Sequence, residues 1–406
     1  MSRKGYILLK KIKIEEVKKM PKLYYFNPEH DMALANGSSN FTPPESAAFL
    51  SGDLSLLPCW YAETGGVVLS DQTFPEEYNP INLDIKTVAP FTSDLMKECK
   101  AEPWGWDLAV RKYFIQNGVD PHMLPSEAYI NKIKELSHRR IASKAMQYLR
   151  DEACDKFHFP EPAIEYNNIS DVISHIKSSE EVVIKAPWSS SGKGVYWINK
   201  VLMPSNEGWC KRVIEKQGSI MIEKAYERVR DFAMEFRLIQ GEVLFAGYSL
   251  FYTEGTGIYR GNRLLSNEAI VEKLNKWVST EELDWVKEKL TVFFKNNIAP
   301  YYSGYIGVDM FIYQEGENYY LNPMVEINLR MTMGMVARIL YDRYVYRGSE
   351  GMFVIDHLPP GELLEHHNSR YEAQKMECRD NKFYKGYFSL CPISDNTLYR
   401  ASIILE

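Results

Sequence analysis

The sequence predicts an α/β protein in which two smaller α/β regions precede a larger antiparallel sheet. Three observations carry this prediction. Short apolar strands alternate with helical segments over residues 20–125, which is the pattern of an α/β domain. The same alternation continues on a smaller scale over 126–222. Within residues 223–345 the strands become long, and Gly241 and Gly316 stand at the turns of antiparallel pairs.

The first region is predicted to begin with a buried strand, Lys22–Phe26, followed by a polar loop that contains His30 and Asp31. Ligands bind at the carboxyl ends of strands in open α/β sheets, so these two residues are candidate substrate contacts. The other elements predicted in sequence order are the helix Pro44–Leu57, the strands Gly66–Ser70 and Lys86–Ala89, and the helices Trp104–Asn117 and Ser126–Arg150.

The second and third regions follow the same reasoning. The second is predicted to contain the strands Ala163–Tyr166, Glu181–Ala186, Val195–Ile198 and Ser219–Glu223, with the helix Ser170–Ser178. The third is predicted to contain the strands Phe232–Gln240, Val243–Phe251, Gly307–Tyr313 and Tyr319–Ile327, with the helices Glu281–Asn296 and Met333–Tyr344. We expect the last two of these strands to form a hairpin.

Two terminal segments stand outside this pattern. Residues 1–19 are basic, and their apolar run Tyr6–Leu9 is too short for the core of a signal peptide. We interpret them as an N-terminal extension, with a basic membrane-surface helix as the alternative. Residues 346–406 are interpreted as a C-terminal extension that closes with a hairpin of Phe383–Leu390 and Thr397–Leu405.

The composition narrows the class of protein. The chain has 406 residues, of which 45% are hydrophobic and 13% aromatic, which suits a folded protein of several domains. A formal net charge of −6 argues against nucleic acid as a partner. No run of eighteen apolar residues occurs, so we expect no membrane span. The six cysteines are scattered and form no CxxC pair, which favours a cytoplasmic location. A homodimer is compatible with the sequence.

A strand that ends in Lys185 leads into a loop of small residues, and this segment is the first candidate site. Its loop residues are Ser189, Ser190, Ser191, Gly192, Lys193 and Gly194. Small residues let backbone N–H groups approach a polyphosphate, and the strand lysine adds a fixed cation. A Walker A loop is excluded, because a glycine follows Lys193 where that motif requires serine or threonine. A solvated hairpin without a ligand is the alternative.

Acidic residues mark the second candidate site. Alternate residues of a strand share a face, so Glu326, Asn328 and Arg330 point the same way, and the predicted hairpin brings Asp309 within reach of Glu326. Two carboxylates and an amide oxygen suit Mg²⁺, with Mn²⁺ as an alternative ion. Arg330 would then meet the γ-phosphate of a nucleotide or an acyl phosphate. The alternative is an internal salt bridge between Glu326 and Arg330.

Taken together, residues 140–330 resemble the ATP-grasp superfamily, with four parts in the order of the family. The resemblance implies that ATP lies between a lid domain within 126–222 and a main domain within 223–345. It assigns Lys185 and the loop Ser189–Gly194 to the phosphates and Asp309, Glu326 and Asn328 to the metal. It also assigns Glu223 to the adenine, Lys224, Ala225 and Tyr226 to backbone contacts with the nucleotide, Asp231 to the ribose, and either Arg140 or Lys144 to an upstream cation.

The resemblance also implies an activity. Most members activate a carboxylate as an acyl phosphate, which an amine or thiol then attacks, so we expect an ATP- and Mg²⁺-dependent ligase with Arg330 and Arg237 as catalytic residues. A kinase of the same fold and a non-catalytic nucleotide-binding module are the alternatives. The carboxylate substrate, a small molecule or a peptide, is not identified. Arg260 and Arg263, in the glycine-containing stretch Tyr248–Arg263, are candidate substrate contacts, with a solvated loop as the alternative.

Overall fold

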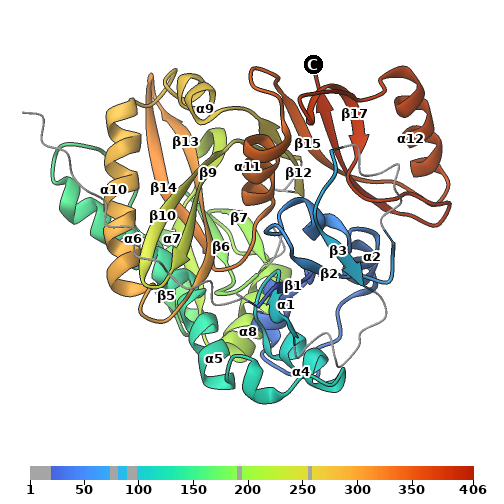
Figure 1. The fold of residues 1–406 in the computed structure, drawn as a ribbon. Coiled ribbons are helices and arrows are strands. Elements are labelled where there is room, and N and C mark those ends of the chain that lie inside the picture. Colours follow the sequence, from blue (N-terminus) through green and yellow to red (C-terminus); the bar gives the residue numbers. More distant parts are fainter. Residues whose placement is uncertain (1–19, 74–80, 89–97, 190–193, 255–257) are drawn as a thin grey trace, which may run out of the picture.

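The computed structural model describes residues 20–73, 81–88, 98–189, 194–254 and 258–406. In these residues the strands form four sheets (Figure 1). Their order along the chain agrees with the predicted sequence of α/β regions followed by long antiparallel strands. None of the helices in this described part combines the length and the apolar composition needed to span a bilayer.

The N-terminal sheet is parallel, with strand order β3-β2-β1-β4. Its strands are β1 (Lys22–Tyr25), β2 (Val67–Leu69), β3 (Lys86–Val88) and β4 (Lys100–Pro103), and its helices are α1 (His30–Asn36), α2 (Glu45–Asp53) and α4 (Leu108–Gln116). The polar loop expected after β1 is shorter than predicted, because α1 begins at His30. The helix predicted to reach Leu57 ends at Asp53, and a 3₁₀ turn follows at Leu57–Trp60.

The helix predicted over Ser126–Arg150 is in fact two helices, α5 (Glu127–Leu136) and α6 (Arg139–Ala153). His138 separates them, because its extended backbone (ψ 136°) ends the first helix and its ring Nδ1 accepts the N–H of Arg140 at 3.0 Å as the cap of the second. The break gives the chain a new helix N-terminus beside the second region. The backbone N–H of Arg139, the first residue of α6, donates to Pro187 O at 3.3 Å.

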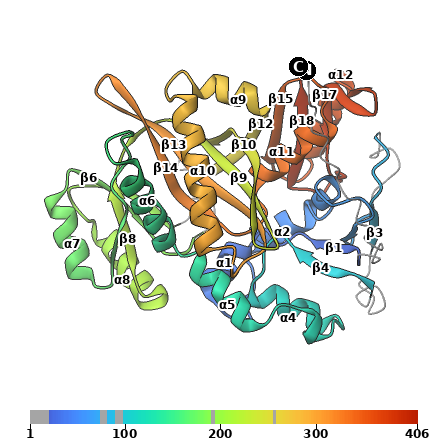
Figure 2. The same cartoon turned by 60° about the vertical axis from the view of Figure 1, so that its left-hand side comes forward.

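The second region forms an antiparallel sheet, here called the lid sheet, with strand order β5-β8-β6-β7. Its strands are β5 (Ile164–Tyr166), β6 (Glu181–Lys185), β7 (Val195–Asn199) and β8 (Ile220–Lys224), and its helices are α7 (Ile169–Ser178) and α8 (Pro204–Gln217). Apolar residues of β6, including Val182 and Ile184, pack with these helices in a core of their own. Figure 2 shows this region at one side of the molecule.

The third region forms the main sheet, with strand order β10-β9-β13-β14. Its strands are β9 (Glu227–Ile239), β10 (Glu242–Ser249), β13 (Gly304–Glu315) and β14 (Asn318–Asn328), and α9 (Asn267–Leu274) and α10 (Thr280–Asn297) accompany them. Phe232, Met234 and Phe236 of β9 point into a core shared with α6 and α10. Because side chains alternate along a strand, Ala233 and Glu235 face the opposite side of the sheet.

The C-terminal residues do not form a separate extension. They complete a six-stranded sheet of order β11-β12-β15-β18-β17-β16, whose first two strands precede residue 265. Its elements are β11 (Phe251–Glu254), β12 (Ile258–Leu264), α11 (Met333–Tyr344), β15 (Gly351–His357), α12 (Glu362–Ala373), β16 (Glu377–Arg379), β17 (Lys382–Ser389) and β18 (Tyr399–Leu405). The predicted terminal hairpin is present as the antiparallel pair β17 and β18. Trp60 of the N-terminal region packs into the same core.

Candidate functional site

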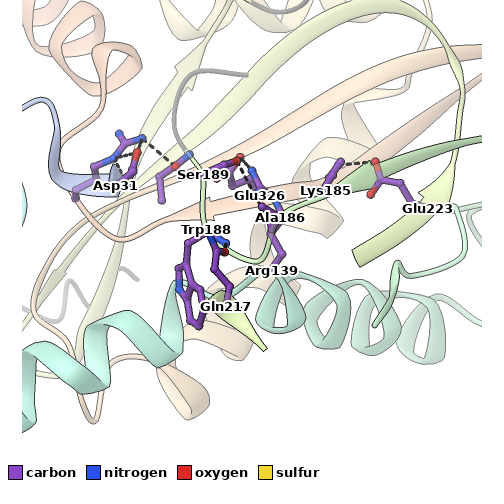
Figure 3. A network of polar contacts seen from close by, with 11 residues as sticks. Asp31, Arg139, Lys185, Ala186, Trp188, Ser189, Gln217, Glu223 and Glu326 are labelled. Carbon is purple, nitrogen blue, oxygen red and sulfur yellow. Dashed lines mark hydrogen bonds and ion pairs between the residues drawn. The ribbon is translucent and has the colours of Figure 1, made fainter. Parts of the chain in front are cut away.

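A buried ion pair lies on the lid sheet where it faces the main sheet. Lys185 ends β6 and Glu223 lies near the end of β8, and the two side chains meet with 2.5 Å between Nζ and Oε1 (Figure 3). The register that pairs Val183 with Glu223 places both on one face of the sheet. Burial lowers the pKa of Lys185, although Glu223 opposes this effect. The strand lysine therefore has a carboxylate partner of its own in this structure.

A narrow cleft separates this pair from α6 and β14. Its free volume is about 20 Å³, and among its lining residues are Arg139, Ser143 and Met146 of α6, Lys185, Glu223 and Tyr226 of the lid and its connection, and Asn322 and Met324 of β14. A nucleotide is far larger, so its entry requires the lid side chains to move away from the main sheet. Two residues expected near the nucleotide have other partners, since Lys224 pairs with Glu315 and Asp231 with Arg228 at 3.4 Å. Ala225 donates its N–H to Glu181 O at 3.1 Å.

Arg139 is the cation that α6 contributes to the cleft. One guanidinium nitrogen donates to Ala186 O at 2.5 Å and to Ser189 Oγ at 3.0 Å, and the other donates to Glu326 Oε2 at 2.8 Å (Figure 3). The predicted alternatives lie elsewhere, because Arg140 donates to Glu165 at 2.8 Å and Lys144 is exposed. The sequence pattern did not single out Arg139, and the break between α5 and α6 that positions it was not predicted. The signal that could have found it is His138, a helix-capping residue placed just before a basic pair.

The loop after β6 is described at its two ends. Residues 190–193, which include the predicted Ser190, Ser191, Gly192 and Lys193, lie outside the described residues. At the first end, Trp188 donates its indole N–H to Lys134 O at 2.8 Å and its backbone N–H to Gln217 Oε1 at 3.0 Å. At the second end, Gly194 has a φ of 92°, a value that favours glycine.

Two carboxylates face each other across the predicted hairpin. The register of β13 and β14 pairs Asp309 directly with Glu326, and Gly307 with Asn328. Burial, followed by the charge of Glu326, raises the pKa of Asp309 to about 7. Buried neighbouring carboxylates repel each other, and a cation relieves that repulsion. The described residues contain no group of three His, Cys, Asp or Glu side chains suited to a metal. A metal here would be held by the two carboxylates, and the Asn328 amide offers a third protein oxygen.

The internal salt bridge considered as the alternative has different partners from those expected. Glu326 pairs with Arg139 at 2.8 Å, whereas Arg330 pairs with Asp31 of α1. Arg330 Nε lies 3.0 and 2.9 Å from the two Asp31 oxygens, and a terminal guanidinium nitrogen lies 2.6 Å from Oδ2. Although burial opposes ionisation, Arg330 keeps the pKa of Asp31 below its usual range. The N-terminal region thus orients Arg330 beside Asn328, whose Oδ1 accepts from it at 3.1 Å.

A larger cavity of about 500 Å³ begins at these residues and extends toward β11 and β12. Its lining residues include Asp31, Asp309, Glu326, Asn328 and Arg330, together with Glu235, Ser249, Thr253, Tyr259 and Asn262. Of the six residues predicted as catalytic or substrate contacts, four are not among those that line it. His30 contacts Asp107 at 3.4 Å, Arg237 contacts Glu63 at 2.5 Å, Arg260 contacts Glu254 at 2.5 Å, and Arg263 donates its backbone N–H to Leu250 O at 2.8 Å.

Comparison with known proteins yields matches at the level of structure. No protein-family model matches the sequence, and no curated protein matches it either. A biotin carboxylase from Campylobacter jejuni in a β-γ-ATP complex is similar, with a TM-score of 0.50 and 11% identity over 95% of this chain and 87% of that one. The biotin carboxylase domain of a Hydrogenobacter thermophilus 2-oxoglutarate carboxylase, with MgADP, ADP and bicarbonate, gives 0.50 and 12% over 96% and 87%.

A Staphylococcus aureus N5-carboxyaminoimidazole synthetase with ADP gives a TM-score of 0.48 and 12% identity over 95% of this chain and 93% of that one. The two biotin carboxylases, whose TM-scores are higher, are the structures that indicate the fold of this chain. At identities of 11% and 12%, they bear on the fold and leave the activity to be argued from the site. They agree with the family resemblance of the motifs, and the chain therefore has the ATP-grasp fold.

Proposed function

We propose that this chain is an ATP- and Mg²⁺-dependent ligase that activates a carboxylate as an acyl phosphate for attack by an amine or thiol. One observation carries the proposal. The cations Lys185, Arg139 and Arg330 and the carboxylates Asp309 and Glu326 converge between the lid sheet and the main sheet, next to a cavity of about 500 Å³. Phosphoryl transfer needs such a set of charges, and the cavity offers room for the group that receives it.

The cleft supplies the binding groups for ATP. Lys185 and Arg139 would hold the phosphates, together with the backbone of the Ser189–Gly194 loop. Glu223 would accept a hydrogen bond from the adenine amino group, with Lys224, Ala225 and Tyr226 beside it, and Asp231 would bind the ribose. The ion pairs of Lys185 with Glu223 and of Arg139 with Glu326 support these roles, because they show charged side chains held in a buried cleft.

Asp309, Glu326 and Asn328 would hold Mg²⁺, and the same oxygen set would accept Mn²⁺. Their fit to a cation is supported by the partly buried, adjacent carboxylates and by the raised pKa of Asp309. A bound ion supplies neutralisation of charge on the phosphate oxygens. Arg330, which Asp31 orients at the boundary between these residues and the cavity, would stabilise charge on the transferring phosphoryl group.

A substitution of one metal ligand tests the proposal. In Glu326→Gln we expect nucleotide binding to persist through Lys185, Glu223 and the loop, while ATP turnover falls by at least tenfold, because the ion acts more strongly on the transition state. Nucleotide binding is measured by calorimetry with and without Mg²⁺. Turnover is measured as the release of ADP from ATP in the presence of a metabolite extract. Glu317→Gln, at an exposed turn position of the same hairpin, is the matched control. A Glu326→Gln protein with unchanged Mg²⁺ dependence and turnover refutes the metal assignment.

A product assay separates the ligase from the kinase and from the binding module. Hydroxylamine converts an acyl phosphate into a hydroxamate and releases phosphate, whereas a phosphorylated alcohol is stable to it. We expect a hydroxamate that requires ATP, Mg²⁺ and a fraction of the extract. A stable phosphorylated alcohol assigns the kinase instead. Nucleotide binding without ADP release in any fraction assigns the binding module.

A further inference from the structure

Glu235 of β9 faces the cavity from the second row of the main sheet. In the first row, Ala233 of β9 pairs with Asp309, which pairs with Glu326. In the next row, Glu235 pairs with Gly307, which pairs with Asn328. All three strands present these residues on one face, and the glycine between them has no side chain. The carboxylate of Glu235 therefore lies in the row next to the candidate metal ligands, and the side chains of Thr332 and Glu235 occupy the space over Gly307.

Two hydroxyl groups fix the position of the Glu235 carboxylate, but no cationic side chain pairs with it in the described residues. Glu235 is 1% exposed, and its two oxygens accept from Ser249 Oγ and Thr332 Oγ1, each at 2.9 Å. A Cβ at position 334 would lie 2.1 Å from Glu235 Oε1, so Gly334 provides the space that this carboxylate occupies. Among the described residues, none of the ion pairs involves Glu235. Burial raises its pKa to about 7, against the effect of the two hydroxyl hydrogen bonds.

The other charges of the cavity are already matched. Arg330 is paired with Asp31, and Glu326 with Arg139. Asp309 belongs to the metal site proposed above. Glu235 is then the carboxylate for which the cavity provides no cation, and a buried charge without a partner is costly. A ligand with a positive group offsets that cost, whereas a neutral thiol does not.

Asn262 of β12 lines the same cavity and supplies a second polar group that lacks a full set of partners. It is 0% exposed, and its Oδ1 accepts the hydroxyl of Tyr259. Its Nδ2 is buried and has no hydrogen-bond partner within the described chain. A buried donor of this kind normally has an acceptor, because leaving it unpaired costs free energy. A neutral oxygen of a ligand is the acceptor that suits an already acidic cavity.

We propose that this cavity is the binding site for the amine substrate of the ligase, with Glu235 accepting hydrogen bonds from a primary ammonium group and Asn262 donating one to a neutral oxygen of the same molecule. The substrate class is a compound with a free α-amino group next to an amide, the chemistry of a peptide N-terminus. The proposal rests on the proposed function and extends it from amines or thiols in general to this class of amine.

Binding of twenty L-amino-acid amides provides the test, with the N-acetylated amides as matched compounds that lack the cation. The full-length protein is saturated with Mg²⁺ and a non-hydrolysable ATP analogue, and binding is followed by thermal shift and calorimetry. We expect at least one free amide to bind and its acetylated counterpart to bind at least tenfold more weakly. Glu235→Gln and Asn262→Ala should each weaken binding of that amide at least tenfold. Glu227→Gln, exposed on the same strand, is the control.

Each outcome separates this inference from the function on which it rests. If the ATP analogue binds but no free amide does, or if Glu235→Gln binds the amide as tightly as the unchanged protein, the amine site is refuted and the ATP site stands. Binding of N-acetyl-cysteinamide in preference to the free amides refutes it in favour of a thiol. If the ATP analogue itself does not bind, the proposed function fails, and the amine site fails with it.

Discussion

Arg139 joins three parts of the molecule through one side chain. Its guanidinium contacts Ala186 O and Ser189 Oγ in the loop after β6 and Glu326 of β14, while its backbone begins α6. It is 7% exposed, whereas 48% of the Arg140 side chain is exposed. Adjacent arginines therefore have different physical roles, and this pair offers a controlled comparison.

We expect Arg139→Ala to weaken ADP binding by roughly 1.5–3 kcal/mol, the range for a charged hydrogen bond. The melting temperature should also fall without Mg²⁺, because Glu326 loses its partner, and Mg²⁺ should restore part of it by occupying that carboxylate. Calorimetry and thermal unfolding with and without Mg²⁺ measure both effects. Arg140→Ala should change ADP binding little. Equal effects of the two substitutions on ADP binding would contradict the assignment of Arg139, rather than Arg140, as the arginine that binds the nucleotide.

Lys185 and Lys224 form a second matched pair on neighbouring lid strands. The Lys185 side chain is 4% exposed and faces Glu223 in the cleft, while Lys224 is 61% exposed and pairs with Glu315. Lys185→Ala should weaken nucleotide binding by roughly 1.5–3 kcal/mol through loss of a buried cation. Lys224→Ala should leave it within about 0.5 kcal/mol, as surface substitutions usually do. An unchanged nucleotide affinity in folded Lys185→Ala would place the phosphates elsewhere.

Local patterns could predict several of these residues. Strand alternation and a predicted hairpin were enough to predict that Asp309, Glu326 and Asn328 share one face of the sheet. The register of β13 and β14 agrees with that prediction. The same rules could not find Glu235. The space that its side chain occupies is provided by Gly307 and Gly334, which lie on other elements. Nor could they place the arginines, since a long flexible side chain takes the partner that tertiary structure offers, as Arg237 does with Glu63.

At the scale of elements, the pairing of β13 with β14 makes one contribution to the pH dependence of stability. The pKa of Asp309 is raised from 3.8 to about 7 by burial and by Glu326. The folded state therefore binds this proton more tightly than the unfolded state does. The stability that this proton contributes is present below about pH 4 and is lost as pH rises toward about 7. The raised pKa of Glu235 acts in the same direction.

Asp309→Asn removes this pH dependence, because the amide mimics the protonated acid. Without divalent ions we expect the variant to gain stability relative to the unchanged protein between pH 5 and pH 8, by on the order of 1–4 kcal/mol. At pH 8, Mg²⁺ should raise the melting temperature of the unchanged protein and not that of the variant. Denaturant unfolding at the two pH values measures the difference, with the exposed Asp155→Asn as control. A pH-independent difference would contradict the raised pKa.

At the scale of the whole molecule, the two ends of the described chain share one core. Trp60 is 0% exposed and packs against Tyr344, Phe383 and Phe388, and its indole N–H donates to Leu390 O at 2.7 Å. The N-terminal region and the C-terminal sheet therefore stabilise each other across more than 300 residues of sequence.

Trp60→Ala should cost about 3–5 kcal/mol in the free energy of unfolding, because it leaves a cavity in this shared core. Denaturant titration followed by far-UV circular dichroism measures the change. Trp197, which is 43% exposed on β7, supplies the control, and Trp197→Ala should change stability by less than about 0.5 kcal/mol. If Trp60→Ala unfolds at the same denaturant concentration as the unchanged protein, the shared core does not stabilise the fold.

The global arrangement was predictable only in part. The N-terminal α/β region, the lid strands and the long antiparallel strands follow from periods of apolar residues, and all are present. The pairing of β12 with β15, residues 258–264 with 351–357, joins segments that no local pattern relates. Sequence periodicity identifies which residues face a core, but it does not say which distant strand completes a sheet.

The cations of the cleft and of the adjoining cavity already have protein carboxylates as their counterions: Glu223 for Lys185, Glu326 for Arg139 and Asp31 for Arg330. A phosphate that binds here must replace these carboxylates as the partner of each cation. Because the cations are already paired within the protein, phosphate binding releases few salt ions from them. Because buried pairs are screened much less than exposed ones, nucleotide affinity should depend only weakly on ionic strength. The protein would then bind ATP with nearly constant affinity in media of very different salt content.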